Sequence, residues 1–422
     1  MKINKTRLNF NLIFIVIITI FSFGIFLSSC NENPTSLGFP LDTLEVMTIS
    51  SEDEAIITDS ENQYARLQTM YNRPFFYVGK YNDMTAISFL RYRFVPDTLT
   101  YVDESKIVSV KLNLKPTRYA IGDTVAGNLA FDVYELQKPF TNQTNWEEIY
   151  PTGNGGNEIS DFFKTGKVGS YSGKITLKDT LDAFKADLDK KLIVDWLRFA
   201  ESTDTTQYSY SFALIPNSGS TFISKLFAPG NSTSTAAFDP TIEVIYKNKT
   251  DELDTLIIKT AVYSSFVNAN KPTDANKIVV QGGVAMRSLL HFDISKIPAK
   301  SSIVKAQLEL HIIDEESYAG NRGKDTTLTA SMDSIGVVAY NVPFAAIRES
   351  GSTKFVFPSI SSAVQKWNLA DGKGSLTIYA NRNGNDFEEP AFLDRYTFHG
   401  TKSADVNKRP KLTIFYTKRP NL

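Results

Sequence analysis

The chain has 422 residues, of which 42% are hydrophobic and 12% aromatic, and its 45 basic residues balance its 46 acidic residues. Nucleic-acid binding proteins carry a basic excess, so this balance argues against a nucleic-acid partner. The chain has a single cysteine, which excludes an internal disulfide bond. The fold must therefore depend on its hydrophobic core.

Residues 1–29 have the layout of a secretory signal peptide. Lys2, Lys5 and Arg7 precede an apolar run over residues 8–27, which ends in the sequence LSSC, with the cysteine at Cys30. This ending resembles the bacterial lipobox, in which the cysteine is lipidated and becomes the new N-terminus. We expect a lipoprotein anchored through Cys30 in the outer membrane or at the cell surface. An uncleaved transmembrane anchor is the alternative, because about twenty apolar residues can span a bilayer.

The polar, turn-rich residues 30–45 are expected to form a tether, and the chain after them shows one strand pattern twice. Apolar residues alternate in 88–96 and again in 288–296, which predicts strands with one buried face. A second alternating pair follows at 105–116 and 301–312. In that pair we expect these side chains to face inward: Val108, Val110, Leu112 and Leu114 in the first copy, and Val304, Ala306, Leu308 and Leu310 in the second.

The order of the later elements also repeats. Ile193 and Trp196 have the three-residue spacing of one helix side, as do Val364 and Trp367. Each predicted helix precedes a predicted strand, at 210–217 and 374–381, and each copy ends in a strand that follows a proline, within 239–247 and 409–417. The repetition predicts an internal duplication, with a polar junction at 248–254.

We therefore predict an all-β protein with two tandem jelly-roll-like antiparallel β-sandwich domains after the lipoprotein signal peptide. The first domain spans residues 46–248 and the second spans residues 254–418. An insertion near 150–172 is rich in glycine and is expected to be a surface loop of the first domain.

The second copy resembles a known family. The stretch RSLLHFDISKIPAKSSIVKAQLELHI, the AVQKW helix and the final strand with Pro410, Leu412, Ile414 and Tyr416 are similar to DNRLRE-domain proteins, a group that overlaps carbohydrate-binding module family 96. NWEEI around Trp146 is also similar. The resemblance covers 254–418 well and 46–248 more loosely, where Arg93 stands in place of Asp293. It implies β-sandwich modules of surface proteins that bind polysaccharide in some members.

Catalytic signatures are missing from the sequence, so we expect no enzyme activity. His291 and His311 can share a sheet face with Asp293 and Glu309 as a metal cluster, or form an ordinary polar face. The oxygen-rich loop 381–394 can bind Ca²⁺, or serve only as a turn. We otherwise predict no metal and no cofactor.

Polysaccharide binding needs exposed aromatic rings, with cations added where the polymer is anionic. The candidate residues follow these two chemistries, although each ring can equally pack in the core and each cation can lie on a solvated face. They are Tyr71, Arg91, Arg93, Lys111, Tyr119, Trp146, Tyr263 and Tyr318. We expect a non-catalytic, polysaccharide-binding surface lipoprotein. The alternative is a structural or adhesive envelope lipoprotein that acts through protein–protein contacts.

Overall fold

The computed structural model describes residues 46–52, 56–64, 71, 73–93, 102–151, 160–175, 177, 183–201, 210–228, 238–283, 286–321, 327–332, 344–380 and 392–418. The predicted signal peptide, Cys30 and the tether lie outside these residues. So does most of the oxygen-rich loop 381–394. No helix within the described ranges has the length and apolar character needed to cross a membrane.

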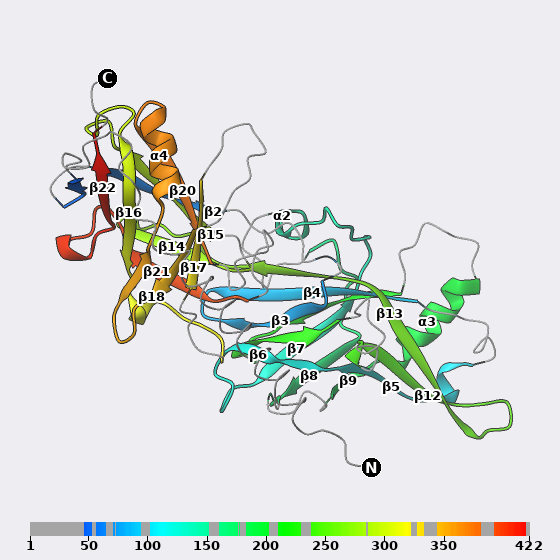
Figure 1. Cartoon of the computed structure of the whole chain (residues 1–422). Coiled ribbons are helices and arrows are strands. Elements are labelled where there is room, and N and C mark those ends of the chain that lie inside the picture. Colours follow the sequence, from blue (N-terminus) through cyan, green and yellow to red (C-terminus); the bar gives the residue numbers. More distant parts are fainter. Residues whose placement is uncertain are drawn as a thin grey trace, which may run out of the picture. The chain divides into compact units, whose positions relative to one another are not determined.

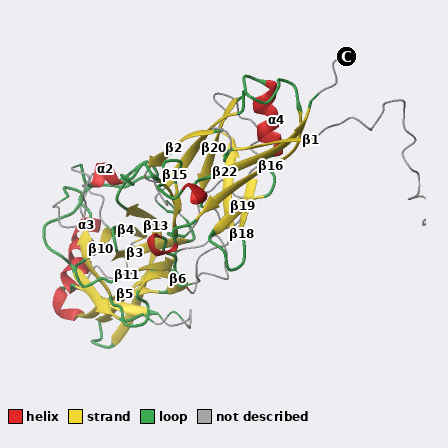
Figure 2. Ribbon diagram, turned by 90° about the vertical axis from the view of Figure 1, so that its left-hand side faces the viewer, coloured by secondary structure: helices red, strands yellow, loops and turns green. Residues whose placement is uncertain are grey.

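The protein is all-β, as predicted, and its strands form two 11-stranded sheets (Figure 1). Every pairing with a described register is antiparallel. The few helices accompany a chain that is mostly strand (Figure 2). The α-helices of the described residues are α2 (Trp146–Ile149), α3 (Lys190–Glu201) and α4 (Ser361–Leu369).

The first sheet closes into a barrel. Its strand order is β10-β7-β8-β9-β5-β12-β13-β4-β3-β11-β6, and a further pairing of β10 with β4 closes the ring. The strands are β3 (Phe75–Tyr81), β4 (Met84–Arg93), β5 (Ile107–Leu114), β6 (Pro116–Gly122), β7 (Leu129–Glu135), β8 (Gly169–Gly173), β9 (Phe184–Leu188), β10 (Ser211–Pro216), β11 (Phe222–Phe227), β12 (Thr241–Lys247) and β13 (Leu253–Asn268).

The second sheet follows the order β1-β22-β16-β19-β18-β17-β20-β15-β14-β21, with β2 paired to β15. Its strands are β1 (Val46–Ser50), β2 (Ile57–Tyr64), β14 (Lys277–Gln281), β15 (Met286–Asp293), β16 (Ser302–His311), β17 (Thr327–Met332), β18 (Phe344–Arg348), β19 (Lys354–Phe357), β20 (Lys373–Tyr379), β21 (Arg395–His399) and β22 (Lys411–Thr417).

Matched strands of the two copies pair with matched partners. In the first sheet β4 pairs with β10 and β5 with β12, and in the second sheet β15 pairs with β20 and β16 with β22. Both predicted helices also bury the expected residues: Ile193 and Trp196 in α3, and Val364 and Trp367 in α4. The order of elements read from the sequence therefore reappears in the pairing of the strands.

The change from one sheet to the other differs from the predicted boundary. Residues 248–251 form the turn between β12 and β13, and β13 pairs with both β12 and β4 of the first sheet. In return β2, drawn in blue, pairs with β15 of the second sheet (Figure 1). β13 comes before the other strands of the second copy in the sequence but belongs to the first sheet. β2 comes before the strands of the first copy but belongs to the second sheet. This reciprocal strand exchange moves the end of the first sheet from residue 248 to Asn268.

The first copy's insertion is also part of the barrel. The predicted surface loop 150–172 contains most of β8, which pairs with β7. Phe162 is 2% exposed and packs with Trp146 and Phe89 over the outer side of β4. Since Leu90 and Tyr92 face the barrel interior, β4 is buried on both sides. The interpretation of this segment as a surface loop was wrong for residues 169–172, which are strand, and for the buried Phe162, whereas the rest of 160–168 consists mainly of turns and bends.

One matched position in each copy departs from the alternation. Val108 is 44% exposed and Val304 is 57% exposed, although both were expected to face inward. Each valine lies where the strand register shifts, opposite the closing strand of its copy. A β-bulge at that position inserts one extra residue and turns its side chain outward.

Candidate ligand-binding cleft

A polar cleft of about 260 Å³ lies on the second sheet, beside the segment that joins it to β13. Its floor comes from β14 and β21, and its rim from residues 270–274. The lining residues are Asn270, Lys271, Pro272, Thr273, Asp274, Lys277, Val279, Glu316, Tyr318, Arg395 and Thr397. Pockets for drug-sized ligands are mostly apolar and about 300–1,000 Å³, so this smaller polar cleft suits a hydroxyl-rich ligand better.

Asp83 holds one wall of the cleft in place. It follows Asn82, whose φ of 50° allows the tight turn between β3 and β4. One carboxylate oxygen of Asp83 accepts hydrogen bonds from the backbone N–H of Asn270 and from Arg395 Nη1, each at 3.0 Å. The other accepts from the Tyr318 hydroxyl at 3.1 Å. A hairpin of the first sheet thus fixes two side chains of the cleft.

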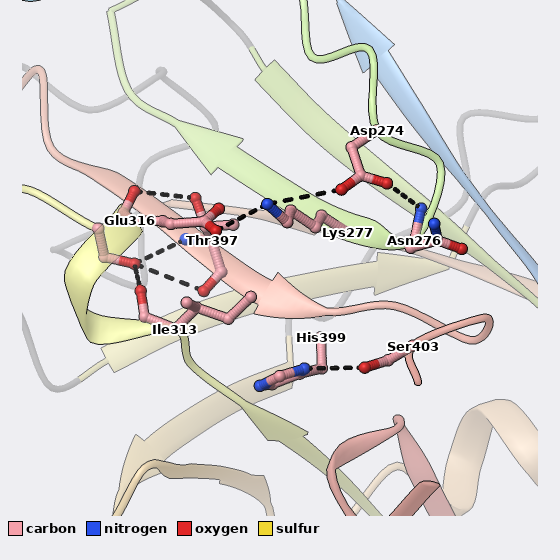
Figure 3. Close-up of polar contacts among 9 residues, drawn as sticks. Asp274, Asn276, Lys277, Ile313, Glu316, Thr397, His399 and Ser403 are labelled. Atoms are coloured by element: carbon pink, nitrogen blue, oxygen red, sulfur yellow. Dashed lines mark hydrogen bonds and ion pairs between the residues drawn. The ribbon is translucent and has the colours of Figure 1, made fainter. Parts of the chain in front are cut away.

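Lys277 holds the other wall. Its ammonium group lies 2.7 Å from Glu316 and 3.5 Å from Asp274, as Figure 3 shows. The hydrogen bond to Glu316 raises the pKa of Lys277. Burial raises the pKa of Tyr318 to about 12, so its hydroxyl stays protonated at neutral pH. The Lys277 ammonium and the Tyr318 hydroxyl are therefore fixed hydrogen-bond donors of the cleft at pH 7.

The charges in this region cancel. Lys271, Lys277 and Arg395 supply positive charge, and Asp83, Asp274 and Glu316 supply negative charge. Lys277 and Arg395 already pair with carboxylates, so an anionic ligand would have to compete with those partners. A neutral ligand with several hydroxyl groups can instead bind beside the intact pairs.

Of the predicted binding residues, Tyr318 alone lines this cleft. Tyr119, Trp146 and Tyr263 are 1%, 2% and 3% exposed, so the structure contradicts their prediction as stacking platforms. Tyr119 packs between the two sheets, Trp146 covers β4, and Tyr263 faces the barrel core. Tyr71 is half-buried, with its ring edge-on to Phe140 at 6.4 Å.

The basic residues predicted to bind an anionic polymer do not lie together. Arg91 and Arg93 lie on β4 and Lys111 lies on β5, with β12 and β13 between them. Lys111 is 3.3 Å from Asp187 and lies opposite Glu243. Alternation within single strands could not reveal these intervening strands. The suggested cluster of His291 with His311 fails for the same reason, because four strands separate β15 from β16 in the sheet order.

Sequence reasoning missed Asp83, Lys277, Glu316 and Arg395. Their spacing carries no motif, because the fold brings them together from a hairpin, two strand ends and a 3-10 turn. The described part of the oxygen-rich loop is Phe392–Asp394, and Asp394 accepts a hydrogen bond from the buried Tyr119 hydroxyl at 2.7 Å. Among the described residues, no group of three or more His, Cys, Asp and Glu side chains is placed to hold a metal ion.

No family model and no curated protein matches the chain. Two solved structures resemble it weakly. The VP2 subviral particle of infectious bursal disease virus has 10% identity and a TM-score of 0.15, and the match covers 90% of this chain and 79% of that one. The Macrobrachium rosenbergii nodavirus structure has 9% identity and a TM-score of 0.12, with 87% and 94% covered. Similarities this low carry no argument about function.

Proposed function

We propose that this protein is a non-catalytic lipoprotein of the outer membrane or cell surface, anchored through Cys30, that binds a neutral polysaccharide through the cleft on β14 and β21. The observation that carries the proposal is the charge-balanced polar lining of the cleft. Sugar hydroxyl groups both donate and accept hydrogen bonds, and paired charges present both kinds of partner. A binding site of this type needs no metal and no cofactor.

The proposal assigns a limited role to aromatic stacking. Every described aromatic side chain is buried or half-buried, so the described surface offers no broad exposed ring. Tyr318 is half-buried, and the guanidinium of Arg395 lies over its ring, 5.8 Å from the centroid. We infer that hydrogen bonds in the cleft, with the edge of one tyrosine, would hold a single sugar unit.

Binding measurements on the full chain in detergent would test the proposal. We would titrate wild type with neutral polymers and with uronic-acid polymers, and expect binding of a neutral polymer. The double variant Lys277→Gln/Glu316→Gln keeps the net charge and should weaken that binding at least tenfold. The matched control is Lys185→Gln/Glu243→Gln, which removes a pair of similar length, 3.0 Å, on the first sheet. The control should bind like wild type.

Equal affinity of both double variants would contradict the proposed site. Binding only of uronic-acid polymers would contradict its ligand class. Exposed ion pairs contribute about 0–1 kcal/mol to stability, so both variants are expected to fold. Release of reducing ends from a bound polymer would show that the protein is an enzyme and contradict the non-catalytic assignment.

A structural or adhesive role is the second candidate. It is favoured by the exposed large hydrophobic side chains of the described residues, which are all aliphatic. Val108 on β5 and Leu253 and Ile257 on β13 are among them, and these two strands flank β12 in the barrel. If no polymer binds to wild type, the Leu253→Ser/Ile257→Ser variant tests this second role. The role would be supported if a protein partner that wild type holds at the cell surface is no longer held by the variant.

A further inference from the structure

Two histidines meet across neighbouring strand ends of the second sheet. Ile312 forms an antiparallel bridge with Phe398, and the backbone N–H of Ile313 donates to the carbonyl of Thr397 at 2.7 Å. One residue further along this register, His311 lies opposite His399. Directly opposed residues of an antiparallel pair have Cα atoms about 4.5–5.5 Å apart.

Both imidazoles point to the accessible side of the sheet. Ile312 and Phe398 are 2% and 0% exposed and face the core. Because side chains alternate along a strand, the adjacent His311 and His399 face outward together. Both are half-buried, so the rings are partly shielded but remain open to a small ion.

Each ring is held through the same nitrogen. His311 Nδ1 lies 3.3 Å from the Thr353 hydroxyl. His399 Nδ1 lies 2.9 Å from the Ser403 hydroxyl, as Figure 3 shows. Neither Nε2 atom has a hydrogen bond among the described residues. Histidines that bind metals in proteins usually fix one nitrogen by a hydrogen bond and coordinate through the other.

The charges beside the pair are largely neutralised. Lys354 lies opposite His311 and is 3.3 Å from Glu309. Lys277 lies opposite His399 and pairs with Glu316 at 2.7 Å. Burial lowers the pKa of both imidazoles from its ordinary value. Other charged groups that act on the two rings are Glu315, Asp405 and Lys408.

We propose that His311 and His399 form a two-histidine binding site for a transition-metal dication such as Cu²⁺ or Zn²⁺, coordinated by both Nε2 atoms. Two nitrogens at about 2.0–2.1 Å from a tetrahedral ion lie about 3.3 Å apart, which opposed histidines can reach. Water fills the remaining positions, since the described residues supply no third carboxylate, thiolate or imidazole there. Oxygen-preferring ions such as Mg²⁺ are not expected to bind.

Isothermal titration of the untagged full chain in detergent, stripped of metal by a chelator, tests this site. Wild type should bind one Cu²⁺ per chain, more tightly than Zn²⁺, and should not bind Mg²⁺. His311→Asn and His399→Asn should each weaken Cu²⁺ binding at least tenfold. His291→Asn is the matched control, because His291 lies half-buried on β15 and is the third histidine of the chain. It should bind Cu²⁺ like wild type.

Electron paramagnetic resonance of the wild-type Cu²⁺ complex provides a test without any variant. The expected spectrum shows coupling to two imidazole nitrogens. A spectrum with one nitrogen or none would overturn the proposal, and so would undiminished binding by either His311→Asn or His399→Asn. An equal loss in His291→Asn would overturn it as well. The result is independent of glycan binding, since the two histidines do not line the cleft.

Discussion

Removing the Tyr119 hydroxyl tests whether a buried polar network joins the two sheets. The hydroxyl donates to Asp394 at 2.7 Å and accepts from the backbone N–H of Leu393 at 2.8 Å. Burial raises the pKa of Tyr119 well above its usual value, so the hydroxyl is a donor at neutral pH. Gly320 also donates its N–H to Asp394, at 2.9 Å.

Tyr119→Phe leaves the ring in place and removes both hydrogen bonds. An unpaired buried N–H costs about 1–3 kcal/mol, and a hydrogen bond to a carboxylate contributes about 1.5–3 kcal/mol. The two losses together amount to about 2.5–6 kcal/mol, and because Asp394 keeps its bond from Gly320, we expect a value near the lower end of this range. The free energy of unfolding should fall by about 3 kcal/mol.

Urea unfolding, followed by fluorescence and circular dichroism, measures this loss as a lower midpoint at unchanged slope. Tyr171→Phe is the control, because the Tyr171 hydroxyl makes a single long contact of 3.4 Å with the Lys174 carbonyl. The control should change the free energy by no more than about 0.5 kcal/mol. A Tyr119→Phe variant as stable as the control would refute the reasoning and mean that the network adds nothing to the contact between sheets.

Three further predictions concern packing, pH and anchoring. Gly374→Ala should destabilise the protein by about 1–3 kcal/mol, because the new Cβ would collide with the Trp367 ring, which stacks on Phe292 at 5.0 Å. Thermal unfolding should show a lower midpoint, and a midpoint equal to wild type would contradict the prediction. His311 and His399 have pKa values below the ordinary 6.5, so the unfolded chain binds more protons below that pH. Stability should therefore be complete above about pH 6.5 and decline as the pH falls, and the His311→Asn/His399→Asn variant should flatten this decline in metal-free urea titrations. Cys30→Ala should abolish acylation, detected by mass spectrometry, and an acylated variant would disprove Cys30 as the attachment point.

The sequence was sufficient to predict the all-β class and many of the strands. Period-two runs such as those ending at Leu114 and Leu310 gave correct strands, because one face of each is buried. The same rule placed Val108 and Val304 on the wrong face. A bulge adds one residue to one strand only, so it depends on the partner strand and leaves no trace in the alternation itself.

The partners of each strand could not be predicted in the same way. Nothing in the residues 253–268 distinguishes pairing with β4 from pairing with β15, because both neighbours offer a similar apolar surface. The binding residues were harder still. Tyr119 and Tyr263 look the same in sequence as an exposed tyrosine, and their burial results from contacts with strands far along the chain. Asp83 and Arg395, 312 residues apart, meet only in the folded protein.

The exchange of β2 and β13 has a consequence for cutting the chain. A protease that nicks the turn at residues 248–251 produces two fragments, and each fragment retains a strand hydrogen-bonded within the other's sheet. The two fragments would remain associated through these strand pairings without a covalent link. Neither the part of the chain before this turn nor the part after it supplies all the strands of one sheet.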